Sequence, residues 1–150
     1  MYTVLTVASV ALLGLSAGVF FAFSSFVMSG LDRAGDPAAG EAMTGINDTA
    51  VRPAFMSVFF GALLVTAAAG VLGLVAGDGR AAWVLAAAVV YLVGTVGVTV
   101  AANVPLNNRL LAATDKASGW RGYHRRWTAW NHVRTLAATA AAVLATGGLL

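Results

Sequence analysis

Charged residues are absent from four long stretches of the chain. The uncharged runs cover residues 1–31, 53–77, 81–108 and 135–150. Because a helix needs roughly 20 apolar residues to cross a bilayer core of about 30 Å, each of the first three runs is long enough to span a membrane. The fourth run reaches that length only if its helix begins near Trp127 and takes Asn131, His132 and Arg134 into the membrane interface or the bundle.

This pattern predicts an all-α integral membrane protein with a single transmembrane domain over residues 1–150. We expect an up-down-up-down four-helix bundle with spans at about 3–29, 54–76, 82–104 and 127–149. Only helices and closed barrels satisfy their backbone hydrogen bonds in lipid, and these runs lack the two-residue alternation of barrel strands. The first run is too long, and lacks the basic start, for a cleavable signal peptide, so we expect it to remain as a span.

Composition agrees with a membrane protein. The chain is 59% hydrophobic and 10% charged, whereas a soluble domain carries about 25% charged residues. Disorder requires the opposite balance of low hydrophobicity and high charge. The absence of cysteine excludes disulfides and thiolate metal sites. The net charge of +3 comes from residues too few and too confined to loops for nucleic-acid binding, so we expect the lipid bilayer as the partner.

The basic residues predict the orientation in the membrane. Eight of the nine Lys and Arg residues lie in segments 32–52 and 105–134, which four alternating spans place on the same side. By the positive-inside rule that side is cytoplasmic, so we expect a multi-pass protein of the cytoplasmic (inner) membrane with both termini outside. Segment 105–126 combines leucines with a basic rim, which favours an interfacial amphipathic helix before the fourth span. A short helix is also expected over residues 37–47.

Small residues recur at helical spacing on the predicted spans. The pairs are Gly14 and Gly18, Gly73 and Gly77, and Gly94 and Gly97. Such residues let helix backbones approach closely in lipid, either within one chain or between the copies of a homo-oligomer. The alternative is that glycine is simply frequent in this chain and has no packing role.

Polar side chains gather at the cytoplasmic ends of the predicted helices. On the third span they recur every four positions, at Thr95, Thr99, Asn103 and Asn107. Pro105 lies among them, lacks an N–H group and is expected to interrupt the helix. The stripe either lines a functional site or forms an ordinary helix end whose asparagines bond to neighbouring helices.

Segment 120–134 carries the densest set of aromatic and polar residues. Projected as one continuous helix, a face of roughly 120° contains Trp120, Tyr123, His124, Trp127, Trp130, Asn131 and Arg134. An interfacial belt of aromatic and basic residues explains the first part of this face. It explains Asn131 and Arg134 less well, because an ionisable residue inside a span indicates a functional site.

The two histidines do not form a metal-binding motif. His124 and His132 are eight residues apart and point in directions about 80° apart on one helix. No HExxH sequence is present. We expect no cofactor. The alternative is a metal or haem near His132, which would need a mixed set of ligands such as His132, Asp48 and Glu41.

Four stretches of sequence form a pattern that extends along the chain. They are GVFFAFSSFVMSGL at 18–31, AMTGIND at 42–48, ANVPLNNRL at 102–110 and WTAWNHVRT at 127–135. With them the chain resembles the anthrone-oxygenase-like family of small four-helix membrane proteins. The most specific part is NVPLN followed about 20 residues later by WNHVR. The resemblance implies an oxygenase that converts an anthrone to an anthraquinone. The site positions that it implies are Asn47, Asn103, Pro105, Asn107, Trp130, Asn131, His132 and Arg134.

The residue types at these positions suit that chemistry. An anthrone has an acidic methylene group, and its anion is electron-rich enough to react with O₂. We expect His132 or His124 to accept the proton, and polar donors to hold the oxyanion in a low-dielectric site. The expected catalytic residues are His132, Arg134, Asn103, Asn107 and Asn131. The expected substrate-binding residues, most of them aromatic for stacking on a planar ligand, are Trp130, Trp127, Phe20, Phe23, Asn47, Phe55 and His124.

The sequence leaves three functions open. The first is a membrane-embedded oxygenase that acts on a lipophilic, anthrone-like aromatic with O₂ through base-assisted formation of the anion. The second is a non-catalytic binder or carrier of a quinone-like or lipid-like molecule, because the same residues describe a binding site. The third is a structural membrane subunit. Uptake of O₂ distinguishes the first from the second, and a stable partner protein would favour the third.

Overall fold

The computed structural model describes all residues from Met1 to Leu150 and contains helices joined by short turns, without strands. The first long helix is continuous through α1 (Tyr2–Ala22), η1 (Phe23–Val27) and α2 (Met28–Arg33). It is followed by α3 (Asp36–Ala50) and α4 (Pro53–Val75). Another long helix then runs through α5 (Ala81–Tyr91), η2 (Leu92–Gly97), η3 (Thr99–Asn103) and α6 (Val104–Ala112), and α7 (Lys116–Thr146) is the last. The prediction of an all-helical protein is confirmed.

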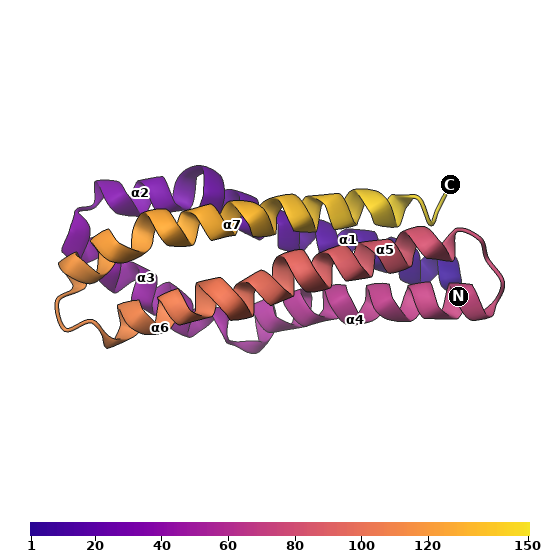
Figure 1. Cartoon of the computed structure of the whole chain (residues 1–150), viewed down its shortest axis with the longest axis horizontal. Helices are drawn as coiled ribbons and strands as arrows, with labels where there is room; N and C mark the ends of the chain where they lie inside the picture. The colour runs from indigo at the N-terminus through magenta and orange to yellow at the C-terminus, as the bar shows by residue number, and fades with distance from the viewer.

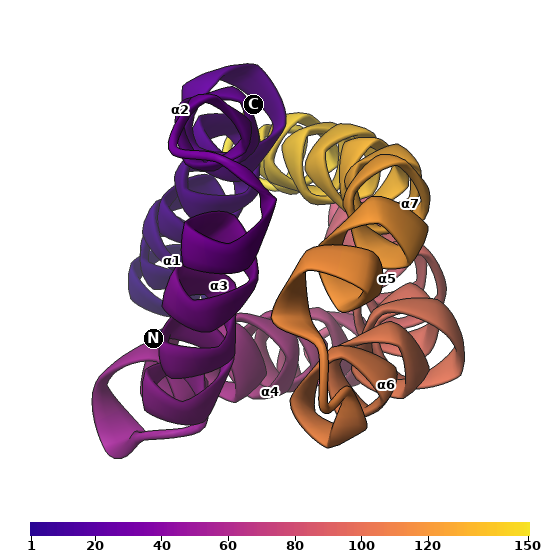
Figure 2. The same ribbon diagram turned by 90° about the vertical axis from the view of Figure 1, so that its left-hand side faces the viewer.

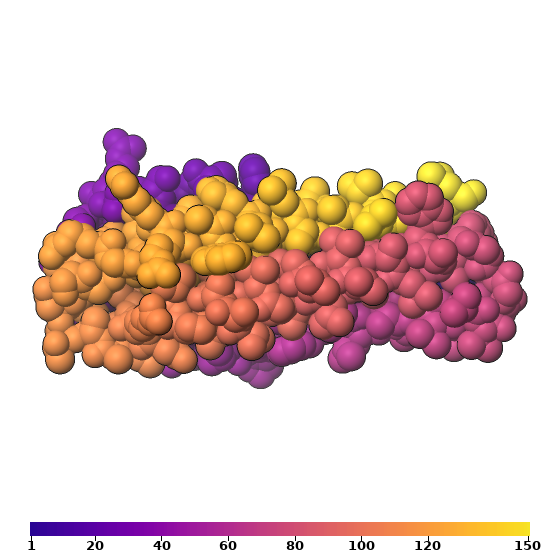
Figure 3. Space-filling model, viewed as in Figure 1, coloured from indigo at the N-terminus to yellow at the C-terminus, as the bar shows by residue number.

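The long helices lie side by side along the molecule's long axis, which makes it an elongated rod (Figures 1 and 3). Helix α1 packs against α4 and α7, and α5 packs against the same two neighbours. Viewed from one end, these four helices surround a common centre (Figure 2). The N- and C-termini lie at the same end of the rod, and α3 lies at the opposite end, against α7 and α6 (Figure 1).

Three helices are long and apolar enough to cross a membrane. They are the continuous helices Tyr2–Arg33, Pro53–Val75 and Ala81–Ala112. Their outer surfaces carry many exposed large apolar side chains, such as Leu64, Val93 and Val100, as expected for helices that face lipid rather than water. Helix α7 is long enough to cross as well, but its first half is rich in basic and aromatic residues, and its crossing stays a prediction.

The prediction that Pro105 interrupts the third span is wrong. The helix continues from Ala81 to Ala112, because wide π-helical turns at η2 and η3 directly precede the proline. At the end of η3 the backbone N–H of Val104 bonds to the carbonyl of Thr99, five residues back. Such wide turns rearrange the usual ladder and accommodate the missing N–H and the ring of a proline.

The separate interfacial helix expected over residues 105–126 is also absent. Instead, α6 extends the preceding helix, and α7 begins after a turn at residues 113–115. Asp115 caps α7 by accepting hydrogen bonds from the backbone N–H groups of Ala117 and Ser118 at 3.0 and 3.3 Å. Leu106 and Leu110, which were expected to face the membrane surface, are buried between the helices. Burial against other side chains removes them from water as effectively as lipid does.

The short helix expected over residues 37–47 is confirmed, with the wider bounds of α3. Its buried face carries Ala39, Gly40 and Met43. At Gly40 the backbone of α7 comes so close that an added Cβ would lie 2.6 Å from the carbonyl oxygen of Lys116. A glycine is therefore needed for α3 to pack against the start of α7.

The interior contains two clusters of buried side chains. The cluster nearer the termini joins α1, α4, α5 and α7 through Leu13, Ala17, Phe20, Phe59, Ala62, Ala87, Tyr91, Ala138, Ala141 and Ala145. The cluster at the α3 end joins α2, α3, α6 and α7 through Met28, Ala39, Met43, Leu106, Leu110, Trp120, Tyr123 and Trp127. The first cluster is rich in alanine, which permits close helix packing, and the second is built from large side chains.

Candidate functional site

A pocket of about 360 Å³ lies where the two buried clusters meet. This volume is within the range of small-molecule sites. Its walls come from α1, η1, α3, α4, η3, α6 and α7, and most of them are apolar. The lining residues are Val19, Phe20, Phe23, Met43, Ile46, Asn47, Thr49, Ala50, Val51, Phe55, Met56, Thr99, Val104, Asn107, Trp127 and Arg134. Two of them, Val51 and Val104, are 69% and 40% exposed, so the pocket reaches the surface of the protein.

Arg134 supplies the only charged side chain in the pocket wall. The residue is 6% exposed. Its Nη1 donates to Thr99 Oγ1 at 3.2 Å and its Nη2 donates to Asn131 Oδ1 at 2.7 Å. The guanidinium carbon also lies 4.6 Å from the ring centre of Phe20 and 5.0 Å from that of Trp127, distances at which an aromatic face attracts a cation.

No carboxylate balances this buried charge. The ion pairs of the protein lie elsewhere, between Arg80 and Asp78, Arg121 and Asp36, and His124 and Asp32. The Nε–H group of Arg134 is buried and has no hydrogen-bond partner. A guanidinium has five N–H donors, and the two hydrogen bonds of Arg134 leave the second N–H of each terminal nitrogen without a partner in the protein.

Asn131 joins Arg134 to the first helix. Its Nδ2 donates to the backbone carbonyl of Phe20 and to Ser24 Oγ, each at 2.7 Å. Phe20 lies one turn before the π-helical stretch η1, where the regular ladder of backbone bonds is disturbed. The side chain of Asn131 therefore satisfies a carbonyl beside this wide turn and at the same time orients the guanidinium through its Oδ1.

Asn107 has a fixed orientation at the pocket wall. Its Oδ1 accepts hydrogen bonds from Tyr123 Oη and Trp127 Nε1, both at 2.9 Å. Because an indole N–H can only donate, the amide must turn its oxygen towards Trp127. The NH₂ end of Asn107 is then left without a partner in the protein and is available at the pocket that this residue lines.

Two further asparagines carry buried amide atoms without partners. Asn47 lines the pocket from α3, and its Nδ2 is buried without a hydrogen bond. Asn103 is 1% exposed and donates to the carbonyl of Trp127 at 3.3 Å, while its Oδ1 has no partner. Asn103 does not line the pocket and instead holds η3 against α7. An unpaired buried polar group is costly, and both of these atoms are enclosed by the protein.

Aromatic rings form the apolar walls of the pocket. Phe20 packs edge-on against Phe55, with ring centres 6.2 Å apart. Phe23 lies 5.6 Å from Trp127 on another wall. These residues belong to three helices that are distant in sequence, and together they provide surfaces against which a planar molecule can pack.

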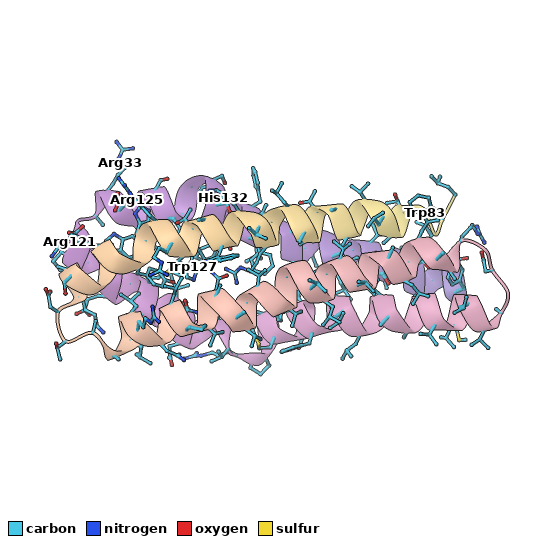
Figure 4. All side chains as sticks on the ribbon, viewed as in Figure 1. Arg33, Trp83, Arg121, Arg125, Trp127 and His132 are labelled. Carbon is cyan, nitrogen blue, oxygen red and sulfur yellow. The ribbon has the colours of Figure 1, made fainter.

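Several of the expected site residues lie outside the pocket. His132 is exposed on the outer side of α7, whereas Trp127 points between the helices (Figure 4). Trp130 is 44% exposed and does not line the pocket. The reason is geometric: on a straight helix the inward face is already occupied by Trp127, Asn131 and Arg134.

His124 lies at the α3 end of the rod, away from the pocket wall. Its ring stacks on Trp120, with ring centres 5.0 Å apart, and its Nδ1 lies 3.4 Å from Asp32 Oδ1. Asp32 also accepts a hydrogen bond from Trp120 Nε1 at 3.0 Å. This arrangement joins α2 to α7. No group of three or more His, Asp or Glu side chains could hold a metal ion, so His132, Asp48 and Glu41 are not brought together.

Sequence reasoning missed the wide helical turns and two hydroxyl residues that they position. Ser24 bonds to Asn131 and to Thr135, and Thr99 bonds to Arg134 while donating to the carbonyl of Thr95. Thr99 belongs to the polar stripe of the third span, which was a usable signal. Ser24 had none, because a serine in an apolar helix commonly bonds to its own backbone.

Comparison with known proteins identifies the family. No curated protein and no solved structure matches the chain. A family model described as anthrone oxygenase matches residues 55–144, which is more than half of the chain. The matched part includes Phe55, Thr99, Asn107, Trp127 and Arg134 of the pocket wall. The chain therefore belongs to the anthrone oxygenase family.

Proposed function

We propose that this protein is a membrane-embedded oxygenase that oxidises a lipophilic, anthrone-like aromatic with O₂ in the pocket beside Arg134. The observation that carries the proposal is one pocket that combines aromatic walls with a buried, uncompensated guanidinium. A planar ketone fits both features, because its rings pack against Phe20, Phe55 and Trp127 while its oxygen faces the cation. Family membership supports the reaction class.

The chemistry requires an electron-rich carbon next to a stabilised oxygen. When the methylene group of an anthrone loses a proton, the negative charge spreads onto the ketone oxygen. The anion gives up electrons to O₂, one oxygen atom becomes the new carbonyl, and the other leaves as water. Hydrogen-bond donors already directed at that oxygen lower the energy of the anion. Arg134 and Asn107 are the donors at the pocket wall.

We also propose that α7 crosses the membrane with the three apolar helices, in an up-down-up-down bundle within the cytoplasmic membrane. Its first half carries Arg121 and Arg125 at the α3 end of the rod (Figure 4). The positive-inside rule puts that end in the cytoplasm and both termini outside. Gly14 and Gly18 have no atom within 4 Å of an added Cβ, so this face of α1 is open for contact with a second copy.

Turnover of a simple anthrone by the purified, full-length protein in lipid nanodiscs tests the oxygenase. We expect O₂ consumption that matches formation of the quinone, measured with an oxygen electrode and by absorbance. Arg134→Gln should lower kcat by about 100-fold or more, as removal of an oxyanion donor does. Arg125→Gln, at an exposed position, removes the same charge and should leave turnover unchanged. Turnover equal to that of empty nanodiscs would contradict the proposal.

A binder or carrier of a quinone-like molecule is the second candidate. The observation that favours it is the lack of a proton-accepting carboxylate or imidazole among the pocket-lining side chains. Such a protein would bind an anthrone or its quinone with the same dependence on Arg134 and would not consume O₂. The oxygen electrode therefore distinguishes the two functions.

A further inference from the structure

We propose that the pocket binds planar lipophilic acids, namely phenols and enolisable aromatic ketones, as their anions, with Arg134 as the counter-ion and no protein group as the base. This inference deepens the proposed function, because it assigns the charge state of the ligand at the same site. It extends to phenols without a methylene group, which the proposed reaction cannot convert, so it can be tested without turnover.

The pocket holds one uncompensated positive charge. Arg134 is the only charged residue that lines it, and no Asp or Glu oxygen lies within ion-pair distance of the guanidinium. Placing an unpaired arginine inside a membrane is energetically costly. Contacts with Phe20 and Trp127 offset part of that cost. An anion is the ligand that gains most from the remaining positive field.

The free hydrogen-bonding end of Asn107 also suits an anion. Because the Oδ1 of Asn107 accepts hydrogen bonds from Tyr123 and Trp127, its NH₂ group is the end left without a partner at the pocket wall. Thr99 is already engaged as both donor and acceptor. A phenolate or enolate oxygen only accepts hydrogen bonds, so it matches the NH₂ group of Asn107 and the guanidinium.

Neither histidine is placed to take the proton from a ligand in the pocket. His132 is exposed on the outer side of α7, and His124 is held between Trp120 and Asp32. On ionisation the O–H or C–H bond of the ligand breaks, the electron pair stays on the ligand, and the proton passes to water at the open side of the pocket. The nearby cation drives this step, because an opposite charge within about 4–6 Å favours the ionised form of an acid by one to three powers of ten.

Other titratable groups near Arg134 do not neutralise its charge. From α7, Tyr123 donates to Asn107, and from α5, Tyr91 is hydrogen bonded to Ser16 and to the carbonyl of Phe59. Helix α4 carries no titratable side chain. The acids of α3 do not line the pocket: Glu41 and Asp48 are exposed and Asp36 pairs with Arg121, while Asp32 of α2 contacts Trp120 and His124. Tyrosines ionise near pH 10, so measurements below that pH report on the ligand.

Binding of 2-naphthol to the full-length protein in nanodiscs tests the proposal, because the neutral and ionised probe absorb at different wavelengths. We expect the bound probe to ionise at lower pH than in empty nanodiscs, which corresponds to a 10- to 1000-fold preference for the anion. The control ligand 2-methoxynaphthalene cannot ionise and should bind equally at every pH. Arg134→Lys should keep part of the preference for the anion, and Arg134→Met should reduce it further.

Two results would overturn the proposal: ionisation of the bound probe at the same pH as in empty nanodiscs, or binding of 2-naphthol no tighter than its methyl ether at high pH. Both comparisons use the wild-type protein, so they hold even if Arg134→Met does not fold. The result is separate from the oxygenase test. If the protein ionises 2-naphthol but consumes no O₂, the anion site stands and the oxygenase proposal fails. If it consumes O₂ with an anthrone but does not ionise 2-naphthol, the oxygenase stands and the anion site fails.

Discussion

Asn131 Oδ1 accepts a hydrogen bond from Arg134 Nη2 at 2.7 Å, within the same turn of α7. The other end of that amide donates to the carbonyl of Phe20 and to Ser24 on the first helix. The direction of the buried guanidinium is thus tied to the backbone of a helix more than one hundred residues earlier in the chain. Asn131 acts on a ligand only through Arg134 and is a positioning residue.

Replacing Asn131 by leucine should destabilise the protein. The change removes the hydrogen bonds of the amide to Arg134 Nη2, to the carbonyl of Phe20 and to Ser24 Oγ. Each buried polar group that loses its partner costs about 1–3 kcal/mol. Chemical unfolding in detergent, followed by circular dichroism, measures the loss. Asn108→Leu is the matched control, because Asn108 is exposed on α6, and its effect should stay within about 0.5 kcal/mol. Equal stability of the two variants would contradict the positioning role.

Removing His132 should not affect the pocket. The side chain is exposed and has no hydrogen bond to any pocket residue, so His132→Ala should retain wild-type kcat, KM and ligand affinity within experimental error. Steady-state O₂ uptake and 2-naphthol binding provide the measurements. A large fall in kcat with unchanged ligand affinity would instead identify His132 as a base and require α7 to rotate during turnover.

The two kinds of glycine should respond differently to alanine. At Gly94 an added Cβ would lie 2.5 Å from the Cβ of Ala137, so η2 and α7 would have to separate. Gly94→Ala should therefore lower the free energy of unfolding by about 1–3 kcal/mol. At Gly14 an added Cβ would have no atom within 4 Å. Gly14→Ala should therefore raise the free energy of unfolding by up to about 1 kcal/mol through helix propensity. Loss of an oligomer in Gly14→Ala, measured by light scattering, would instead assign that face to a contact between copies.

Cysteine labelling tests the topology, because the chain has no natural cysteine. Thr3→Cys and Leu150→Cys lie close to the two termini, at the same end of the rod (Figure 1), and both positions are exposed. A membrane-impermeant maleimide should label both from outside intact cells, and Ala113→Cys, in the turn between α6 and α7, only after the membrane is opened. Labelling of Thr3→Cys and Leu150→Cys from opposite sides would mean that α7 does not cross.

The ion pair in the turn between α4 and α5 should make a contribution to stability that depends on pH. Hydrogen bonds from the side chain and backbone of Arg80 lower the pKa of Asp78 from 3.8 to about 2. A lowered pKa in the folded protein means that the carboxylate contributes to stability above its unfolded pKa, and the contribution is lost as the pH falls from about 4 to 2. The thermal midpoints of wild type and Asp78→Asn should therefore converge over that range. Because the pair is exposed, the difference between the two thermal midpoints at neutral pH should be small and should decrease in high salt.

The periodicity of the chain by itself determined which segments are helical. Uncharged runs longer than a bilayer crossing leave few alternatives to long helices, because backbone groups in lipid must bond within their own segment. The helical face of segment 120–134 was also readable, since Trp127, Asn131 and Arg134 follow helical spacing and all three are buried. Local sequence sufficed for these features because they depend on a few adjacent turns of one helix.

The tertiary structure was needed to show which residues of that face meet the other helices. Trp130 is a neighbour of Asn131 in sequence and lies on the same projected face, yet it points outwards, because packing against α1 and η3 selects a narrow strip of α7. The pocket itself joins residues of the first helix, α3, α4, α6 and α7. Phe20, one turn before η1, and Thr99, the first residue of η3, both contact Arg134 across helices. No periodicity along a single helix contains that information, because the fit depends on side chains from segments far apart in the chain.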